Sequence, residues 1–146
     1  ISDLTSASEL GTAPTGNGRR QSYKRKAYSR MTNTFFEAGT DKLEDMIASI
    51  KHGYMLFETN NGMEDPKNWA IQCVAQYGIE IVDGKLTDNW VSPVVMSGYV
   101  PDLLKSISMI SDEIEMSGAG FCGKGYKEWV RVSDGGPALK VRVKLG

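Results

Sequence analysis

The longest regular pattern in the chain is an alternation of apolar and polar side chains between residues 69 and 81. An alternation of period two predicts a β-strand with one buried and one wet face, which is typical of an antiparallel sheet. Asp83 and Gly84 follow, and this dipeptide is preferred in the two-residue turn of a β-hairpin. We expect a returning strand over residues 86–96, with Pro93 at an edge or bulge. The apolar face comprises Trp69, Ile71, Cys73, Ala75, Tyr77, Ile79 and Ile81.

A helical period replaces the alternation over residues 41–51, where apolar side chains recur at three- and four-residue spacing. Thr40 is a fair N-cap for this helix, and Gly53 can take the left-handed conformation that ends one. His52 then lies at the helix end, where an imidazolium interacts with the last carbonyl groups. Pro101 opens a second short helix, because proline is favoured in a first turn. The two apolar stripes are Leu43, Met46, Ile47 and Ile50, then Leu103, Leu104 and Ile107.

The other segments predict short strands joined by loops. Residues 1–18, rich in Gly, Ser, Thr and Ala, indicate a loop or extended tie to a missing N-terminal part of a longer protein. Strands are expected at residues 20–36, 54–58, 128–132 and 139–145, a glycine-rich loop at 117–125 and a turn at 134–137. Together these elements predict an α+β fold, mainly an antiparallel β sandwich or open barrel with two or three short helices.

A length of 146 residues suits one domain, which we place at residues 19–146. We expect Trp69, Trp90 and Trp129 in the core or on a sheet face. No apolar run approaches the roughly 20 residues that span a bilayer. No secretion leader is recognisable at the start, so we expect a cytoplasmic protein.

Charge is spread unevenly, although the formal net charge is only -1. Residues 1–36 carry a net charge of +4 and the rest of the chain carries -5. A basic cluster can bind nucleic acid, but a nucleic-acid-binding domain is usually basic as a whole. We therefore favour a solvated or paired surface and do not expect nucleic acid as a partner. The cluster comprises Arg19, Arg20, Lys24, Arg25, Lys26 and Arg30.

The two cysteines, Cys73 and Cys122, show no metal-ligand spacing and are expected to be free thiols or single ligands. Lys124 follows Cys122 closely and could lower the pKa of its thiol. A thiolate there could bind zinc or act as a nucleophile, but a nucleophile needs a base, and nothing brings His52 to it. The residues alone favour a third interpretation, in which Cys122 is a small inert side chain.

Residues 118–125 nearly match the phosphate-binding loop G-x-x-x-x-G-K-[ST], but we reject the match. Gly125 stands where a magnesium-binding hydroxyl is needed. A strand rather than a helix is predicted to follow, so no helix N-terminus would face the phosphates.

Three stretches in combination resemble one family. They are residues 15–20 followed by residues 30–34 and Gly39; the strand pair of residues 69–95; and residues 120–124 followed by residues 133–137 and the strand to Gly146. The most specific pieces are Arg30-Met31-Thr32-Asn33-Thr34 and Cys122-Gly123-Lys124 with Asp134-Gly135-Gly136-Pro137. From about residue 11 onward the chain resembles the C-terminal domain of the TldD/PmbA family, whose members are also known as modulators of DNA gyrase.

The resemblance implies a bacterial or archaeal cytosolic zinc metallopeptidase that acts on peptides or unfolded segments, as a homo- or heterodimer of related subunits. It also implies a zinc ion held by a His-Glu pair and a second His on a helix of the N-terminal region, with Cys122 as the third protein ligand. Gly120, Gly123 and Lys124 are expected to shape the site, whereas chemistry assigns no role to Arg30 and Asn33. The Cys motif favours the TldD-like branch over the PmbA-like branch, which looks metal-free.

One departure from the family pattern is decisive for this chain. No His-Glu sequence occurs between Ile1 and Gly146, so the chain by itself is expected to hold no zinc tightly and to hydrolyse nothing. The alternative is a non-catalytic, PmbA-like scaffold domain that pairs with a catalytic subunit.

Overall fold

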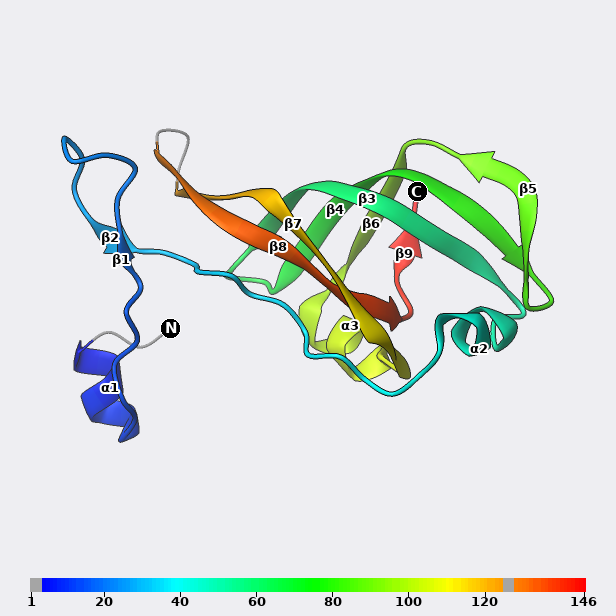
Figure 1. The fold of residues 1–146 in the computed structure, drawn as a ribbon, viewed down its shortest axis with the longest axis horizontal. Helices are drawn as coiled ribbons and strands as arrows, with labels where there is room; N and C mark the ends of the chain where they lie inside the picture. The colour runs from blue at the N-terminus through cyan, green and yellow to red at the C-terminus, as the bar shows by residue number, and fades with distance from the viewer. Residues whose placement is uncertain (1–3, 125–127) are drawn as a thin grey trace. The chain divides into compact units, whose positions relative to one another are not determined.

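The computed structural model describes residues 4–124 and 128–146, which divide into two compact units (Figure 1). The first unit comprises the described residues up to Glu37 and those of Ile114–Gly136, and the second comprises Ala38–Glu113 and Pro137–Gly146. The described residues form open, mostly antiparallel sheets with three short helices. This confirms the α+β class predicted from the sequence, and the sheets of the described residues are open rather than closed into a barrel.

The second unit is built on one antiparallel sheet with the strand order β3-β4-β6-β9 and with β5 paired to β4. The strands are β3 (His52–Asp65), β4 (Ala70–Val82), β5 (Lys85–Val91), β6 (Val94–Tyr99) and β9 (Lys144–Leu145). The predicted alternating strand is β4, and it lies at the centre because three strands pair with it.

The predicted hairpin is present between β4 and β5. Asp83 and Gly84 have φ angles of 46° and 77°, the left-handed pair that a type I′ turn requires. The returning strand is interrupted after Ser92, so that β5 pairs with one end of β4 and β6 with the other. The interruption falls at Pro93, which has no N–H to donate to a sheet.

The core of the second unit lies on one face of this sheet. Ala75 and Ile81 of β4 are each 1% exposed, and Val94 of β6 and Met46 are also buried. The predicted apolar face of β4 is therefore correct at its centre. Trp69 departs from it, because this residue precedes the strand with a φ of 55° and is 58% exposed.

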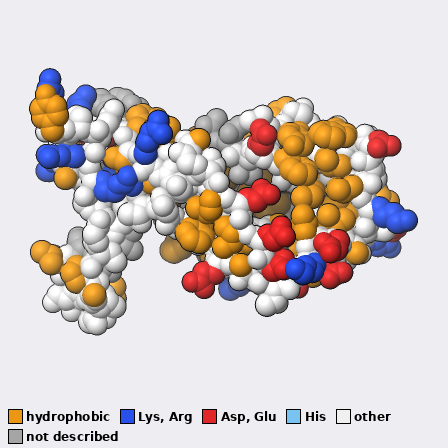
Figure 2. All heavy atoms as spheres, in the orientation of Figure 1, with side chains coloured by type: hydrophobic (Ala, Val, Ile, Leu, Met, Phe, Trp, Pro, Cys, Tyr) orange, Lys and Arg blue, Asp and Glu red, His pale blue; other side chains and the backbone are white. Residues whose placement is uncertain are grey.

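Three aromatic rings stack across neighbouring strands of this sheet. The ring centroids of Phe57 and Tyr77 are 4.9 Å apart, and those of Tyr77 and Trp90 are 5.2 Å apart. Trp90 is thus a sheet-face residue, as predicted, although much of its ring is exposed. Hydrophobic side chains gather on the visible face of this unit over β3 and β4, with acidic side chains along their border (Figure 2). An exposed apolar patch of this kind is typical of an interaction surface.

Both helices of the second unit are short. α2 (Leu43–Ala48) begins after Lys42, which makes no side-chain cap, so the prediction of Thr40 as the N-cap is wrong. Gly53 is not a helix cap either, because β3 begins at His52 and pairs Gly53 with Ile81. α3 (Val100–Ser106) carries its proline in the first turn, as predicted.

The strand β3 is longer than the segment 54–58 predicted from the sequence. It runs through Asn60 and Gly62, where the pairing with β4 shifts register. A β-bulge absorbs residues that would otherwise end a strand.

The first unit contains α1 (Leu4–Leu10) and the two-residue strands β1 (Gly18–Arg19) and β2 (Tyr28–Ser29). A loop was expected where α1 lies, and of the strand predicted at residues 20–36 only the two residues of β2 form. The unit also contains much of the strand pair β7 (Met109–Lys124) and β8 (Glu128–Lys140). The predictions of a glycine-rich loop at 117–125 and of a turn at 134–137 are therefore wrong. Pairing between β7 and β8 keeps both segments extended as far as they are described.

Candidate functional site

Cys122 lies near the end of β7 in the first unit, and its thiol is free and half-buried. Sγ donates a long hydrogen bond to the carbonyl oxygen of Gly123, at 4.0 Å. The side chain of Lys124 lies outside the described residues, so the predicted electrostatic effect of Lys124 on this thiol stays a prediction. A half-buried thiol on a strand is accessible to a metal while its backbone is held in place.

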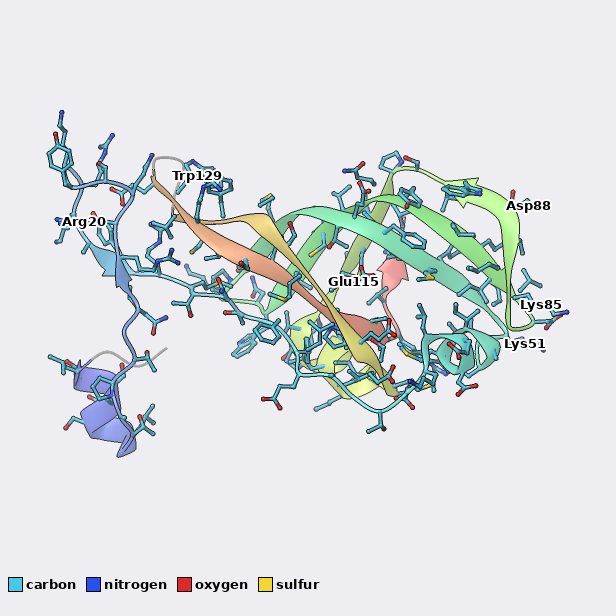
Figure 3. The ribbon with its side chains drawn as sticks, in the orientation of Figure 1. Arg20, Lys51, Lys85, Asp88, Glu115 and Trp129 are labelled. Carbon is cyan, nitrogen blue, oxygen red and sulfur yellow. The ribbon has the colours of Figure 1, made fainter. Side chains whose placement is uncertain are left out.

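The two glycines beside Cys122 allow other groups to approach β7 closely. A Cβ atom on Gly120 would lie 2.9 Å from Cγ of Asp134 and 3.1 Å from the carbonyl oxygen of Val132. A Cβ atom on Gly123 would lie 3.1 Å from the indole of Trp129, which Figure 3 labels near the beginning of β8. Gly120 therefore lies too close to β8 for a side chain without a shift of its neighbours, and a side chain at Gly123 would require the indole of Trp129 to move. That these residues shape the site around Cys122 stays a prediction.

Arg30 is a buried cation joined to the same strand pair. It is 2% exposed, and its Nη2 donates to the carbonyl oxygen of Cys122 and, at 3.1 Å, to that of Glu128. Its own backbone is fixed by Asn17, whose carbonyl accepts from the Arg30 N–H at 2.9 Å and whose Nδ2 donates to the Arg30 carbonyl at 3.0 Å. The structure thus ties residues 17 and 30 to the strand end that carries Cys122.

Asn33, the second motif residue without a predicted role, binds the backbone of β8. Its Oδ1 accepts from the N–H of Ser133 at 2.8 Å. Arg19 donates to the carbonyl of Arg131, and Oε1 of Gln21 accepts from the N–H of Trp129 at 3.4 Å. The three β8 residues are two apart, so their backbone groups face the same edge of the strand. Side chains from the first 33 residues therefore occupy one edge of β8.

The basic cluster proves to be partly structural. Arg30 is buried, and Arg19 donates to two carbonyl groups, those of Met31 and Arg131. Lys24 and Lys26 lie over the rings of Tyr23 and Tyr28, at 5.5 and 5.7 Å from the centroids. Figure 3 shows Arg20 in the first unit as well. Two of the six cations are committed to backbone carbonyls, which weakens the case for a nucleic-acid surface.

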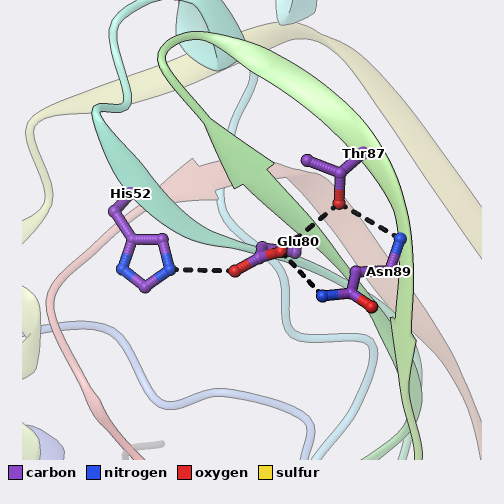
Figure 4. A network of polar contacts seen from close by, with 4 residues as sticks. All are labelled: His52, Glu80, Thr87 and Asn89. Carbon is purple, nitrogen blue, oxygen red and sulfur yellow. Dashed lines mark hydrogen bonds and ion pairs between the residues drawn. The ribbon is translucent and has the colours of Figure 1, made fainter.

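His52 lies in the second unit and does not interact with a helix end, so that expectation is wrong. Its Nε2 lies 3.1 Å from Oε1 of Glu80, and Nδ2 of Asn89 donates to Oε2 of the same carboxylate at 3.0 Å (Figure 4). Thr87 lies at 3.5 Å from Oε2. The side chain of His52 is therefore the hydrogen-bond partner of a carboxylate, that of Glu80. No group of three or more His, Cys, Asp or Glu residues is arranged to hold a metal ion within residues 4–124 and 128–146.

The Glu80 network predicts a specific pH dependence. The hydrogen bonds from Asn89 and then His52 lower the pKa of Glu80 below its ordinary value of 4.5, against a smaller effect of burial. A carboxyl group with a lowered folded-state pKa stabilises the protein above its unfolded-state pKa, and this contribution is lost as the pH falls below 4.5. Glu80→Gln should therefore lower the urea midpoint at pH 6 and have a smaller effect at pH 3.5, as measured by circular dichroism.

The matched control is Asp88→Asn on β5, an exposed carboxylate that has no partner among the described residues. It should leave the pH dependence of the midpoint unchanged. Equal midpoint losses at both pH values for Glu80→Gln would contradict the prediction.

A cavity of about 300 Å³ in the second unit is lined by α3, β6 and residues 142–144. None of the candidate site residues predicted from the sequence lines it. No helix among the described residues is long and apolar enough to cross a membrane.

The described residues thus define an α+β protein of open, mostly antiparallel sheets, with a half-buried free thiol at Cys122. A family model of the PmbA/TldA metallopeptidase C-terminal domain matches residues 1–145, and the chain belongs to this family. The chain is 35% identical over its whole length to a protein of Saccharolobus solfataricus named a zinc metalloprotease TldD homolog, of which it covers 32%. It is 34% identical over 97% of its length to a metalloprotease TldD homolog of Haemophilus influenzae, of which it covers 29%.

Solved structures share this fold. TldE from Thermococcus kodakarensis matches 98% of the chain with a TM-score of 0.70 and 23% identity, and the match covers 30% of that protein. A protein of Thermotoga maritima described as a candidate modulator of a DNA gyrase matches with a TM-score of 0.59 and 19% identity, over 98% of this chain and 28% of that protein. The chain thus spans about a third of the length of the relatives it matches.

Proposed function

We propose that this chain is the C-terminal domain of a TldD-like zinc metallopeptidase that cleaves peptides or unfolded segments in the cytoplasm. In this proposal Cys122 donates its thiolate to the zinc ion. The observation that carries the proposal is the free, half-buried Cys122 on β7, near two glycines that lie close to β8, in a chain that belongs to a metallopeptidase family.

The donor chemistry of this chain fits one zinc ligand and not a whole site. A thiolate is a preferred zinc ligand, and catalytic zinc usually has three protein ligands and one open position. No group of three candidate ligands exists among the described residues, so the other two ligands and the catalytic glutamate are proposed to lie in the N-terminal region of the same polypeptide. Zinc bound there would polarise a peptide carbonyl group and lower the pKa of a bound water.

A peptide substrate is proposed to bind in an extended conformation beside β7. Extended peptides commonly add a strand to a sheet edge, with backbone hydrogen bonds providing affinity. The pair β7–β8 is a two-stranded sheet, and side chains from Arg19, Gln21 and Asn33 already occupy one edge of β8. The strand that carries Cys122 is therefore the better candidate to receive the substrate.

The decisive experiment removes each thiol in turn from the natural full-length protein. Cys122→Ser should lower bound zinc from about one ion per chain to well under half and abolish hydrolysis of an unfolded protein substrate. Zinc is measured by atomic emission after dialysis. The matched control is Cys73→Ser, which removes the thiol of β4 in the second unit and should leave zinc content unchanged.

Full zinc occupancy in Cys122→Ser would overturn the ligand assignment. A full-length protein that holds no zinc would instead support the non-catalytic scaffold. In either case we propose that the N-terminal region of the same chain and a homologous subunit are partners of this domain. The apolar patch over β3 and β4 is a surface suited to such contacts (Figure 2).

A further inference from the structure

The side chain of Arg30 is unusual because it is charged, almost fully buried and incompletely paired. It is 2% exposed and is, among the described residues, one of the two largest side chains that are fully buried. Its Nε and Nη1 are buried and have no hydrogen-bond partner among the described residues, and the same is true of Oε2 of Glu128. A buried guanidinium with unpaired nitrogens destabilises a fold compared with an apolar side chain of similar volume. Its presence calls for a role other than stability.

The contacts that Arg30 does make converge on the end of the strand pair. One nitrogen, Nη2, carries two hydrogens and donates to two carbonyl groups, those of Cys122 on β7 and Glu128 on β8. These carbonyls are 92 and 98 residues away from Arg30 in the sequence, and they precede and follow residues 125–127. A single side chain therefore links both strands where Cys122 lies.

The backbone of Arg30 is itself held firmly enough to act as an anchor. Next to the β1–β2 pair, the Asn17 carbonyl accepts from the Arg30 N–H and the Asn17 side chain donates to the Arg30 carbonyl. The guanidinium is thereby fixed at its base by Asn17 and at its tip by two strands. A side chain that is fixed at its backbone and at its tip can hold the groups bonded to its tip at a defined position.

We propose that Arg30 is a positioning residue that sets the location of the Cys122 backbone, and hence of its thiol, through the hydrogen bond to the Cys122 carbonyl. The expected effect of Arg30 on metal binding rests on the proposed function. The expected effect of Arg30 on the reactivity of the Cys122 thiol does not depend on it. Outer hydrogen bonds that orient a metal ligand commonly change metal affinity by about 10- to 100-fold.

The first test measures the thiol alone, in metal-free full-length protein that carries Cys73→Ser so that Cys122 is the sole thiol of this domain. Arg30→Met keeps the volume and removes every donor, and it should raise the alkylation rate of Cys122 by iodoacetamide about fivefold by loosening the strand end. Arg30→Lys keeps a charged donor, and its Cys122 alkylation rate should lie between those of the wild type and Arg30→Met. Arg19→Met is the matched control, because Arg19 also donates to two carbonyls of this unit but not to that of Cys122.

The second test measures the metal site in protein that retains both cysteines. With Co²⁺ in place of zinc, Arg30→Met should weaken binding about 10- to 100-fold and shift the sulfur-to-metal charge-transfer band, whereas Arg19→Met should change neither. A shift of this band reports the thiolate itself, so a general loss of stability does not produce it.

The outcomes separate this inference from the proposed function. Zinc retained by Cys122→Ser defeats the proposed function, yet the alkylation rates still report on Arg30. Alkylation rates in Arg30→Met equal to wild type, or an equal rise in Arg19→Met, would overturn the positioning role. Should Arg30→Met fail to fold, Arg30→Lys decides in its place. Loss of folding in both variants would show that Arg30 supports the whole unit, and this also overturns the proposal.

Discussion

Gly135→Ala should lower the free energy of unfolding by about 3 kcal/mol or more. Gly135 has a φ of 135°, which L-residues with a side chain rarely adopt, and a Cβ atom there would lie 2.1 Å from the carbonyl oxygen of Glu115 and 2.9 Å from Cα of Met116. Both obstacles are backbone atoms of β7, so no rotation of a side chain relieves the overlap. With a total stability of about 5–15 kcal/mol in ordinary domains, a change of this size removes a large share.

The measurement is the guanidinium midpoint of the purified protein, followed by circular dichroism. Gly118→Ala is the matched control on β7, since its Cβ atom would meet nothing within 4 Å and its φ is not left-handed. We expect this control to be neutral or slightly stabilising, because alanine has less conformational freedom to lose on folding. Equal midpoints for Gly135→Ala and wild type would show that β7 and β8 are not packed as described.

Ile81→Ala should cost about 2–5 kcal/mol, the usual effect of truncating a fully buried aliphatic side chain. Ile81 is 1% exposed on the central strand β4, where it pairs with Gly53 on one side and Leu86 on the other. Truncation removes apolar contacts and leaves a cavity that neighbouring strands cannot close without breaking their register.

Val82→Ala, one residue further along β4, provides the control for the Ile81 experiment. Val82 is 39% exposed, so its truncation should cost less than about 1 kcal/mol. Both variants are compared by thermal and urea unfolding under the same conditions. Equal losses in the two variants would mean that the core does not lie on the face of β4 that carries Ile81.

The fold was predictable from the sequence where local signals decide the structure. The alternation of β4 and the Asp83-Gly84 turn depend on neighbours in the sequence, and both were identified correctly. The segments at 117–125 and 134–137 were predicted as a loop and a turn because their composition is rich in glycine. Over residues 117–124 and 134–137, pairing between β7 and β8 overrides that composition, and pairing partners are not visible in a single sequence.

In the candidate site, too, features set by the local sequence could be predicted and features set by distant contacts could not. Cys122 could be predicted as a metal ligand from a short motif, because the thiol belongs to the motif itself, and this assignment stays a prediction. Arg30 and Asn33 were identified only as motif members, since their roles arise from contacts with residues about 100 positions away. A buried arginine also has no local signature, because burial is a property of the folded chain. His52 was placed at a helix end because the sequence does not show that β3 begins there.

The covered edge of β8 has a consequence for how this protein behaves at high concentration. A bare strand edge is a template on which another molecule can build fibrils or swapped assemblies. Three backbone groups that could nucleate such growth, the N–H of Trp129, the carbonyl of Arg131 and the N–H of Ser133, are already bonded to polar side chains. The segment that contributes those side chains thus protects the protein against self-association along β8, without adding a third strand.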